Sequence, residues 1–350
     1  MVRSRRYLRI VATMVAAAAL GTVWASACTG PSDAGKVTVL CGATEKWCAA
    51  QTQAFTHDTG IEADFVRLSN GEAVARLEAG KASPEFDVWH GGPADGYVAA
   101  ANKGLLEPYV SPRAQVIRPE WKSADGSWTG VYIGVLGFCS NQKDLREHGQ
   151  QPPTSWMDLL DPRYRENISV AHPSTSGTGY TALWTQVMLA NGDQNKAFAY
   201  LSALRPNILQ FTKSGIGPLQ QVGRGEIGTA IMFSHDCVTT REEGFTDLVI
   251  SFPREGTGYE VGGVAVVRGA RNLAAAKAYV DWALTAKAQE IGPTVRSYQV
   301  PTNPAAKVSD FSVRLDQLRL VPYDFAAAGK AKPTLVTRFN DVVAPPTQQR

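Results

Sequence analysis

Hydroxyl-bearing and small residues gather at three places where a predicted strand is followed by a predicted helix. The longest group, within residues 172–180, comprises Ser174, Thr175, Ser176, Gly177 and Thr178; the others are Ser69, Asn70 and Gly71, and Ser214 within residues 212–215. The first backbone N–H groups of a helix have no partner in the helix and lie at the positive end of its dipole. Three such turns from separate parts of the chain predict one shared anion-binding site. Each turn taken alone is more typical of ordinary helix capping.

A histidine and an acidic residue stand together after another predicted strand, residues 229–233. The order there is Ser234, His235, Asp236 and Cys237. An imidazole donates a hydrogen bond to a phosphate or hydroxyl oxygen, and a carboxylate accepts from sugar hydroxyls. The pair therefore favours recognition of a polyol. A structural role for a histidine near a strand end is the alternative.

Two further turns follow the first and third predicted strands, at the edge where open parallel sheets bind ligands. Residues 42–44 end in Thr44, and residues 89–92 contain Trp89, His90 and Gly91. Thr44 is expected to donate to an anion, Trp89 to stack on a sugar ring and His90 to donate to the ligand. Core packing for Trp89 and a simple turn role for His90 are the alternatives.

Short apolar strands alternate with amphipathic helices, which predicts parallel sheets covered by helices. Strands are expected at 36–40, 61–66 and 86–89, helices at 45–57, 71–80 and 93–103, and the rhythm restarts at residue 168. Glycine-rich extended runs at 128–138 and 259–267 are expected to cross between two lobes as a hinge. The predicted fold class is α/β, with two lobes that are each a mainly parallel sheet flanked by helices. The expected N-terminal lobe is 36–135 plus 265–300, and the C-terminal lobe is 136–264 plus 301–350.

Residues 1–27 have the composition of a signal peptide. Four arginines precede an apolar run at 10–23 that is short for a membrane span, and residues 25–27 are the small residues of a cleavage site. Cleavage there leaves Cys28 at the N-terminus, followed by a flexible spacer over 28–35. The site resembles bacterial lipoprotein processing sites with Cys28 as lipid acceptor, although Ala25 stands where leucine is usual. The protein is expected to be exported, either lipid-anchored at the outer face of the cytoplasmic membrane or free in the periplasm.

The remaining cysteines are even in number, which in an exported protein favours disulfides. Cys41 and Cys48 are close enough in sequence to pair across a strand-to-helix turn. Cys139 and Cys237 then pair by elimination, unless either is simply a buried small hydrophobe. The formal net charge of +3 includes the four leader arginines, so the mature chain is near neutral and no nucleic-acid partner is expected.

Motifs along nearly the whole mature chain resemble those of the extracytoplasmic solute-binding proteins of ABC importers. They lie at residues 59–61, 67–72, 87–92, 104–109, 174–178, 276–283, 289 and 321–325. The resemblance is strongest to the ferric-iron-binding branch, whose members also include binders of phosphorylated sugars and organophosphonates. It implies a type II periplasmic-binding fold that closes on its ligand by hinge motion. It also implies a monomer without cofactor or catalytic activity that binds a small anionic solute and delivers it to an importer's permease and ATPase.

Ferric-binding members carry two adjacent tyrosines that ligate the metal, and this sequence contains no such pair. Because trivalent iron favours anionic oxygen ligands, their loss argues against iron. In their place stands the His235 and Asp236 pair, which resembles that of hexose-phosphate binders, whose downstream glutamate matches Glu260. A phosphorylated solute is therefore the first hypothesis.

Two other functions are weighed against it. The second hypothesis is a metal bound by His90, His235, Asp236 and Glu260. The least favoured is a secreted hydrolase using Ser234, His235 and Asp236, because consecutive side chains of an extended segment point in opposite directions.

Overall fold

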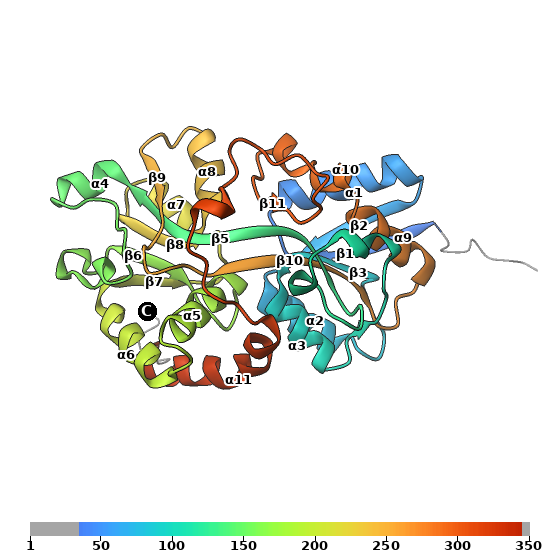
Figure 1. Ribbon diagram of the computed structural model, residues 1–350, viewed down its shortest axis with the longest axis horizontal. Coiled ribbons are helices and arrows are strands. Elements are labelled where there is room, and N and C mark those ends of the chain that lie inside the picture. Colours follow the sequence, from blue (N-terminus) through green and yellow to red (C-terminus); the bar gives the residue numbers. More distant parts are fainter. Residues whose placement is uncertain (1–34, 345–350) are drawn as a thin grey trace, which may run out of the picture. The chain divides into compact units, whose positions relative to one another are not determined.

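The computed structural model describes residues 35–344, which belong to one compact unit. Its strands form two groups, here called the first and second lobes, which are joined through the long strand β5 Thr129–Asn141. The first lobe contains β1 Lys36–Cys41, β2 Glu62–Arg67, β3 Val88–Pro93, β4 Leu106–Glu107, β10 Tyr259–Val267 and β11 Val300–Pro301, and the second contains β6 Ile168–Ala171, β7 Ile208–Thr212, β8 Thr229–Phe233 and β9 Leu248–Ser251. Together they make an eleven-stranded sheet whose main path is β2-β1-β3-β10-β5-β8-β6-β7 (Figure 1).

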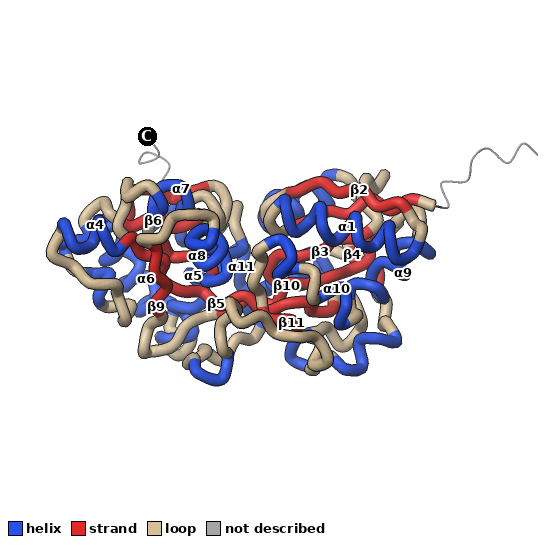
Figure 2. The backbone as a smooth tube through the Cα atoms, turned by 90° about the horizontal axis from the view of Figure 1, so that it is seen from above, coloured by secondary structure: helices blue, strands red, loops and turns tan. Residues whose placement is uncertain are grey.

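Helices flank the strands in both lobes (Figure 2). The first lobe has α1 Glu45–Thr59, α2 Asn70–Ala79, α3 Ala94–Asn102, α9 Leu273–Ala283 and α10 Ala286–Gln289, and the second has α4 Gln142–Glu147, α5 Gly177–Leu189, α6 Gln194–Leu204, α7 Pro218–Gly223 and α8 Ser234–Glu242. The last helix, α11 Phe325–Val342, packs on α3 and also on α5 and α6. Short 3-10 turns lie at Pro112–Val116, Pro119–Trp121, Asp158–Leu160, Pro162–Tyr164, Arg205–Asn207, Gly292–Val295 and Leu315–Gln317. The predicted α/β fold class is confirmed.

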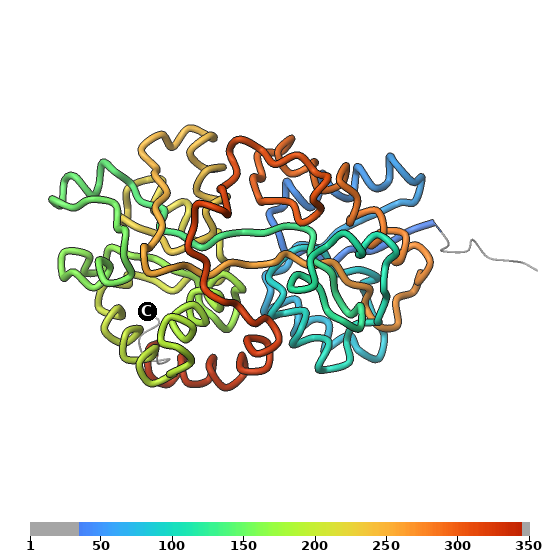
Figure 3. The backbone as a smooth tube through the Cα atoms, viewed as in Figure 1, coloured from blue at the N-terminus to red at the C-terminus, as the bar shows by residue number. Residues whose placement is uncertain are grey.

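The two predicted crossings are the antiparallel pair β5 and β10. The chain leaves the first lobe along β5 and returns along β10, as the green and orange segments of Figure 3 show. Every residue of β5 is buried, so both of its faces are covered. The lobe boundary expected between residues 264 and 265 falls inside β10, whose residues from Tyr259 onward already pair with first-lobe strands or with the first-lobe half of β5. Its hydrogen bonds extend the first sheet along the whole strand.

The largest group of buried apolar side chains continues from one lobe to the other. It includes Trp89 and Tyr97 of the first lobe, Val135 of β5, Trp184 of α5 and Phe339 of α11. Burial stabilises by about 25 cal/mol per Å² of apolar surface, so this shared core ties α3, α5 and α11 to the crossing strands. The starts of these elements are thereby held near the β5–β10 pair.

Both expected disulfides are confirmed. Cys41 and Cys48 join the end of β1 to α1, and Cys139 and Cys237 join β5 to α8. The second bond anchors the helix whose first turn carries His235 and Asp236. The expected signal peptide at 1–27, the lipid acceptor Cys28 and all of the spacer except Gly35 lie outside the described residues.

The two disulfides should differ in their contribution to stability. The cysteines of the pairs lie 98 and 7 residues apart in sequence, and all four are almost fully buried. A disulfide that closes a longer loop restricts the unfolded chain more, so replacing Cys139 and Cys237 by alanine should cost about 2 kcal/mol more than replacing Cys41 and Cys48. Urea unfolding of the two double variants measures this difference. An equal or larger loss for the short-loop pair would contradict it.

Candidate functional site

A narrow cavity lies where the starts of α2, α5 and α8 meet beside the crossing strands. Its walls are Gly42, Ala43, Thr44, Arg67, Ser69, Asn70, Pro93, Tyr132, Ser176, Gly177, Thr178, Gly215, Ile216, Phe233, His235, Asp236, Glu260 and Gln299. The volume open to the centres of water molecules is about 50 Å³. The cavity is therefore a tight polar pocket to which both lobes contribute.

Many of the residues predicted from the sequence lie together here. They are Thr44, Ser69 and Asn70 from the first lobe, Ser176, Gly177 and Thr178 at the start of α5, and His235, Asp236 and Glu260. Two of them present buried polar atoms that have no hydrogen-bond partner within residues 35–344, namely Asn70 Oδ1 and His235 Nδ1. A ligand with both donors and acceptors can satisfy such atoms.

The helix starts around the cavity are capped to different degrees. At α2 the Ser69 hydroxyl donates to Glu72 Oε2 over 2.6 Å, and at α5 the Ser176 Oγ accepts from the Gly179 N–H over 3.4 Å. These contacts match the capping alternative for both serines. No side chain caps the start of α8, where Phe233 is the N-cap residue. A capped start still keeps some N–H groups available to an anion, because one side-chain cap satisfies only part of the first turn.

Trp89, His90 and Gly91 are not among the residues that line the cavity. Trp89 is fully buried and stacks on Tyr97 with ring centroids 4.0 Å apart. The His90 Nδ1 lies 3.0 Å from the Tyr279 hydroxyl, burial lowers the pKa of this histidine to about 3, and the Gly91 carbonyl accepts from the Tyr97 hydroxyl. The reason is that β3 continues to Pro93, so the three residues are interior positions of a strand.

Four other predicted residues lie at the rim of the cavity and not in its wall. The Gly71 N–H donates to the Thr175 carbonyl over 3.1 Å, and the Thr175 hydroxyl donates to the Lys213 carbonyl over 2.7 Å. The Ser174 hydroxyl lies 2.7 Å from His172 Nδ1, and the Ser214 carbonyl accepts from Thr212 Oγ1. The first of these contacts joins the start of α2 to the turn before α5, and the second joins that turn to the segment after β7.

Arg67 is the cation of the cavity wall, and sequence reasoning did not select it. It stands at the end of β2, and its Nε donates to the Ala43 carbonyl over 3.1 Å. The sequence offered one signal for Arg67, which is its position directly after the predicted strand 61–66. The carboxyl ends of parallel strands form the edge at which such sheets bind ligands. Tyr132 and Gln299 were also missed, and neither stands in a turn that the sequence marks as a ligand site.

Burial dominates the electrostatics of the histidine and aspartate pair. Desolvation lowers the pKa of His235, only partly opposed by Asp236, so the imidazole is neutral near pH 7. Desolvation raises the pKa of Asp236, while His235 and the charge of Arg67 act in the opposite direction. The His235 ring lies parallel to Phe233 at 5.7 Å. The pair thus presents a neutral imidazole and a carboxyl to the same small space.

Two ion pairs, called here the closing pairs, join the lobes outside the cavity. Lys46 at the start of α1 pairs with Glu243 after α8, and Lys213 Nζ lies 2.6 Å from Glu72 Oε1. The hydrogen bond from Lys213, with one from Ser69, lowers the pKa of Glu72 to about 2. Because Glu72 also caps α2, the second pair ties the second lobe to a helix start of the cavity.

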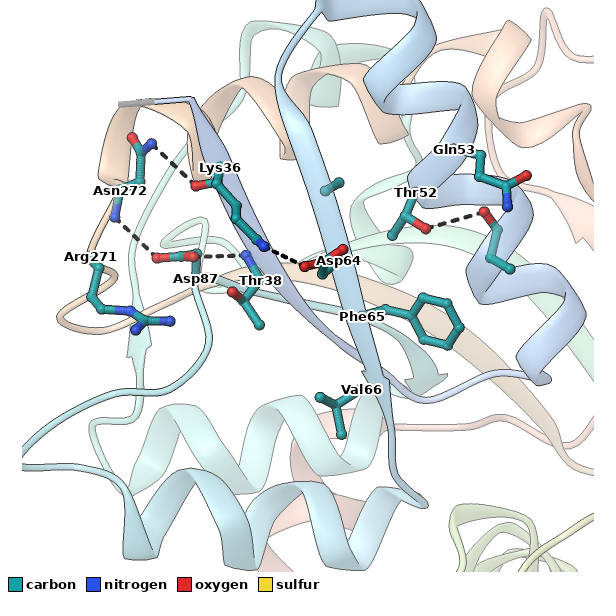
Figure 4. Close-up of a pocket in the computed structure, with 12 residues that line it drawn as sticks. Lys36, Thr38, Thr52, Gln53, Asp64, Phe65, Val66, Asp87, Arg271 and Asn272 are labelled. Atoms are coloured by element: carbon teal, nitrogen blue, oxygen red, sulfur yellow. Dashed lines mark hydrogen bonds and ion pairs between the residues drawn. The ribbon is translucent and has the colours of Figure 1, made fainter. Parts of the chain in front are cut away.

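Larger hollows in the described part of the chain lie away from these residues. One of about 730 Å³ opens at the β1–β2 edge between Thr52, Phe65 and Arg271 (Figure 4). Its polar groups are largely engaged with each other, since Asp87 accepts from the Thr38 N–H and Lys36 pairs with Asp64. Another, of about 880 Å³, lies beside Trp121, Tyr259 and Leu315. Neither contains a predicted site residue, whereas the small cavity brings many of them together, so the small cavity is the candidate site.

Across residues 35–344, no three His, Cys, Asp or Glu side chains form a group that could hold a metal ion. His90, one of the four proposed metal ligands, is held in the core by Tyr279. In that range no helix combines the length and apolar character needed to cross a bilayer.

These features define a two-lobe binding protein with its polar site between the lobes. The chain belongs to the bacterial extracellular solute-binding proteins, whose family model matches residues 83–327. It is similar to the periplasmic binding protein AfuA from Actinobacillus pleuropneumoniae, whose structure was solved with fructose-6-phosphate bound. The two chains are 38% identical, the match covers 89% of this chain and 99% of that chain, and the TM-score is 0.86.

Two other relatives are more distant. A putative 2-aminoethylphosphonate-binding periplasmic protein of Salmonella typhimurium is 30% identical over 51% of this chain, which spans 48% of that protein. Iron-bound HitA from Pseudomonas aeruginosa is 20% identical with a TM-score of 0.76 over 87% of this chain and 98% of that one. The similarity to HitA shows that the two proteins share a fold.

Loss of a closing pair should speed ligand release. Lys213→Ala removes an exposed charge pair that joins the lobes, and such pairs contribute about 0.2–1 kcal/mol, so release should become up to about fivefold faster. Stopped-flow displacement measures the rate. The matched control is Lys196→Ala, whose partner Asp193 lies in the same lobe. Equal release rates for the parent and both variants would contradict the assignment.

Proposed function

We propose that this protein captures a phosphorylated sugar in the cavity and delivers it to the permease and ATPase of an ABC importer. The observation that carries the proposal is the meeting of three helix starts from both lobes with His235, Asp236 and Glu260 in one pocket. Similarity to a fructose-6-phosphate-bound binding protein over most of both chains supports it. Export, the lipid anchor at Cys28 and a monomeric state are part of the same proposal.

The phosphate group is assigned to the helix starts. The first N–H groups of α5 and the hydroxyls of Ser176 and Thr178 can donate to its oxygens, and Arg67 supplies a positive charge across the pocket. A phosphate offers only acceptors when fully ionised, which matches a wall made of donors.

The sugar part is assigned to the opposite wall. A neutral imidazole offers one donor and one acceptor, and Asp236 accepts from hydroxyls, so together they match vicinal hydroxyl groups. Glu260 on β10 completes this wall. Because these groups contact the non-phosphate part, they determine which phosphorylated compound is chosen.

An organophosphonate is the second candidate, because it shares the anionic head and one relative carries that name. Calorimetry against fructose 6-phosphate, glucose 6-phosphate, 2-aminoethylphosphonate, inorganic phosphate and Fe(III)-citrate separates the candidates. Sugar phosphates are expected to bind most tightly. Tight iron binding without a response to any phosphorus compound would contradict the proposal.

The two walls should respond differently to mutation. A hydrogen bond to a charged group contributes about 1.5–3 kcal/mol, so Ser176→Ala and Thr178→Ala should each weaken binding of every phosphorus compound by about ten- to a hundredfold. His235→Ala and Asp236→Ala should instead reduce discrimination among these compounds. The control is Ser202→Ala on the exposed face of α6. If all four variants fold and bind like the parent protein, the site assignment is wrong.

A further inference from the structure

The start of α2 touches the second lobe outside the cavity wall. The Gly71 N–H of the first lobe donates to the Thr175 carbonyl of the second lobe over 3.1 Å. A Cβ atom on Gly71 would lie 2.4 Å from the Ser174 carbonyl oxygen and 2.9 Å from Thr175 Cα. Both of these are backbone atoms, which cannot turn away as the end of a flexible side chain can. The contact therefore depends on the absence of a side chain at residue 71.

A second glycine makes the reciprocal contact. A Cβ atom on Gly177, the first residue of α5, would lie 2.5 Å from Pro93 Cγ and 3.2 Å from Asn70 Cβ, and both of these residues belong to the first lobe. Each helix start thus presents a glycine to the other lobe, and Gly71 and Gly177 are here called the glycine seam. Gly177 also lines the cavity, whereas Gly71 does not.

Backbone conformation does not explain the glycine seam. Neither Gly71 nor Gly177 is among the glycines with a positive φ angle in residues 35–344, so an alanine can adopt either conformation. Alanine is also the better residue in a helix, because glycine loses more backbone entropy on folding. The small space between the lobes is therefore what requires glycine at both positions.

The turn that accepts the Gly71 hydrogen bond also carries part of the cavity wall. The Thr175 and Ser176 N–H groups donate to the His172 carbonyl over 3.2 and 2.9 Å, which holds the Thr175 carbonyl in place. The carbonyl faces the positive end of the α2 dipole, where an acceptor is favoured. The hydroxyls assigned to the phosphate, those of Ser176 and Thr178, follow in the same segment.

We propose that the glycine seam sets how closely the lobes approach and that Gly71 is a positioning residue, which retains the ligand without touching it. The proposal rests on the proposed function and adds the contact that regulates ligand release from the same site. A phosphate bound to the segment 174–178 keeps the Thr175 carbonyl where Gly71 reaches it. The interlobe bond then keeps both lobes over the ligand.

A methyl group at residue 71 should shorten the lifetime of the complex. In Gly71→Ala the new Cβ pushes against the Ser174 carbonyl and weakens the bond to Thr175, so the release of fructose 6-phosphate should become about ten- to a hundredfold faster. The lobes can part at the crossing strands without unfolding, which relieves the crowding. The urea midpoint of the ligand-free protein should therefore change little.

Two glycines serve as matched controls. A Cβ atom on Gly223 would lie 2.8 Å from the Phe245 ring, and both residues belong to the second lobe. Lobe motion cannot relieve this crowding, so Gly223→Ala should lower the urea midpoint and leave the release rate unchanged. Gly35→Ala, where no described atom lies within 4 Å of the added Cβ, should change neither quantity.

The test is stopped-flow displacement of fructose 6-phosphate from the mature protein and these variants. Small-angle X-ray scattering of the same proteins with saturating ligand reports how far the lobes close. The radius of gyration should fall on ligand addition in the parent, fall less in Gly71→Ala and fall least in Gly71→Ser, whose side chain is longer.

Amide hydrogen exchange of the parent protein gives a readout that needs no variant. Exchange at the Gly71 N–H should slow when the ligand is added, because closure gives this group its acceptor. Unchanged exchange there, or release at the parent rate from both Gly71 variants, would overturn the proposal. A loss of stability in Gly71→Ala as large as in Gly223→Ala would also overturn it, because it would show a structural role. Absence of binding of any phosphorus compound to the parent would instead contradict the proposed function.

Discussion

The hydrogen-bonded pair of β5 and β10 is the constraint on which the site depends. It is the connection that carries the chain from one lobe to the other and back, and it also contributes Tyr132 and Glu260 to the cavity wall. The continuous apolar core beneath it holds α3, α5 and α11 in place. A disulfide from β5 to α8 holds the start of α8 in place. The polar groups are therefore positioned by rigid elements, and the lobes approach through the closing pairs and the rim contacts.

The charge distribution of the cavity explains how a site for anions can contain carboxyl groups. Helix starts, hydroxyls and Arg67 line the cavity together with Asp236 and Glu260, and Asp236 itself lies in the first turn of α8. Lys332 offsets Asp95, and Arg67 acts on Asp236. Burial lowers the pKa of His235 and raises that of Glu260, which favours the uncharged form of both side chains. A ligand that enters the cavity loses hydrogen bonds to water, and the donors and acceptors of the cavity wall replace them.

Local sequence signals predicted the fold and much of the cavity because both depend on short-range patterns. The turns at Ser69 and Ser176 carry small polar residues directly before apolar helices, and the structure places both beside the cavity. Trp89 and His90 do not line the cavity because β3 continues to Pro93, and nothing local shows where a buried strand ends. Gly71 and Thr175 do not line the cavity, because a backbone hydrogen bond joins them to each other. Arg67 and Gly134 matter only through long-range packing, which the sequence order does not reveal.

The account requires the phosphate to lie at the starts of α2 and α5 and the sugar to lie against His235, Asp236 and Glu260. A crystal structure of the mature protein grown with fructose 6-phosphate tests this most directly. The account predicts phosphate oxygens within hydrogen-bonding distance of the Ser176 and Thr178 hydroxyls and of the first N–H groups of α5, with sugar oxygens at His235 and Glu260. A ligand bound in reverse, a ligand bound in one of the larger outer hollows, or a metal ion at His235 would contradict it.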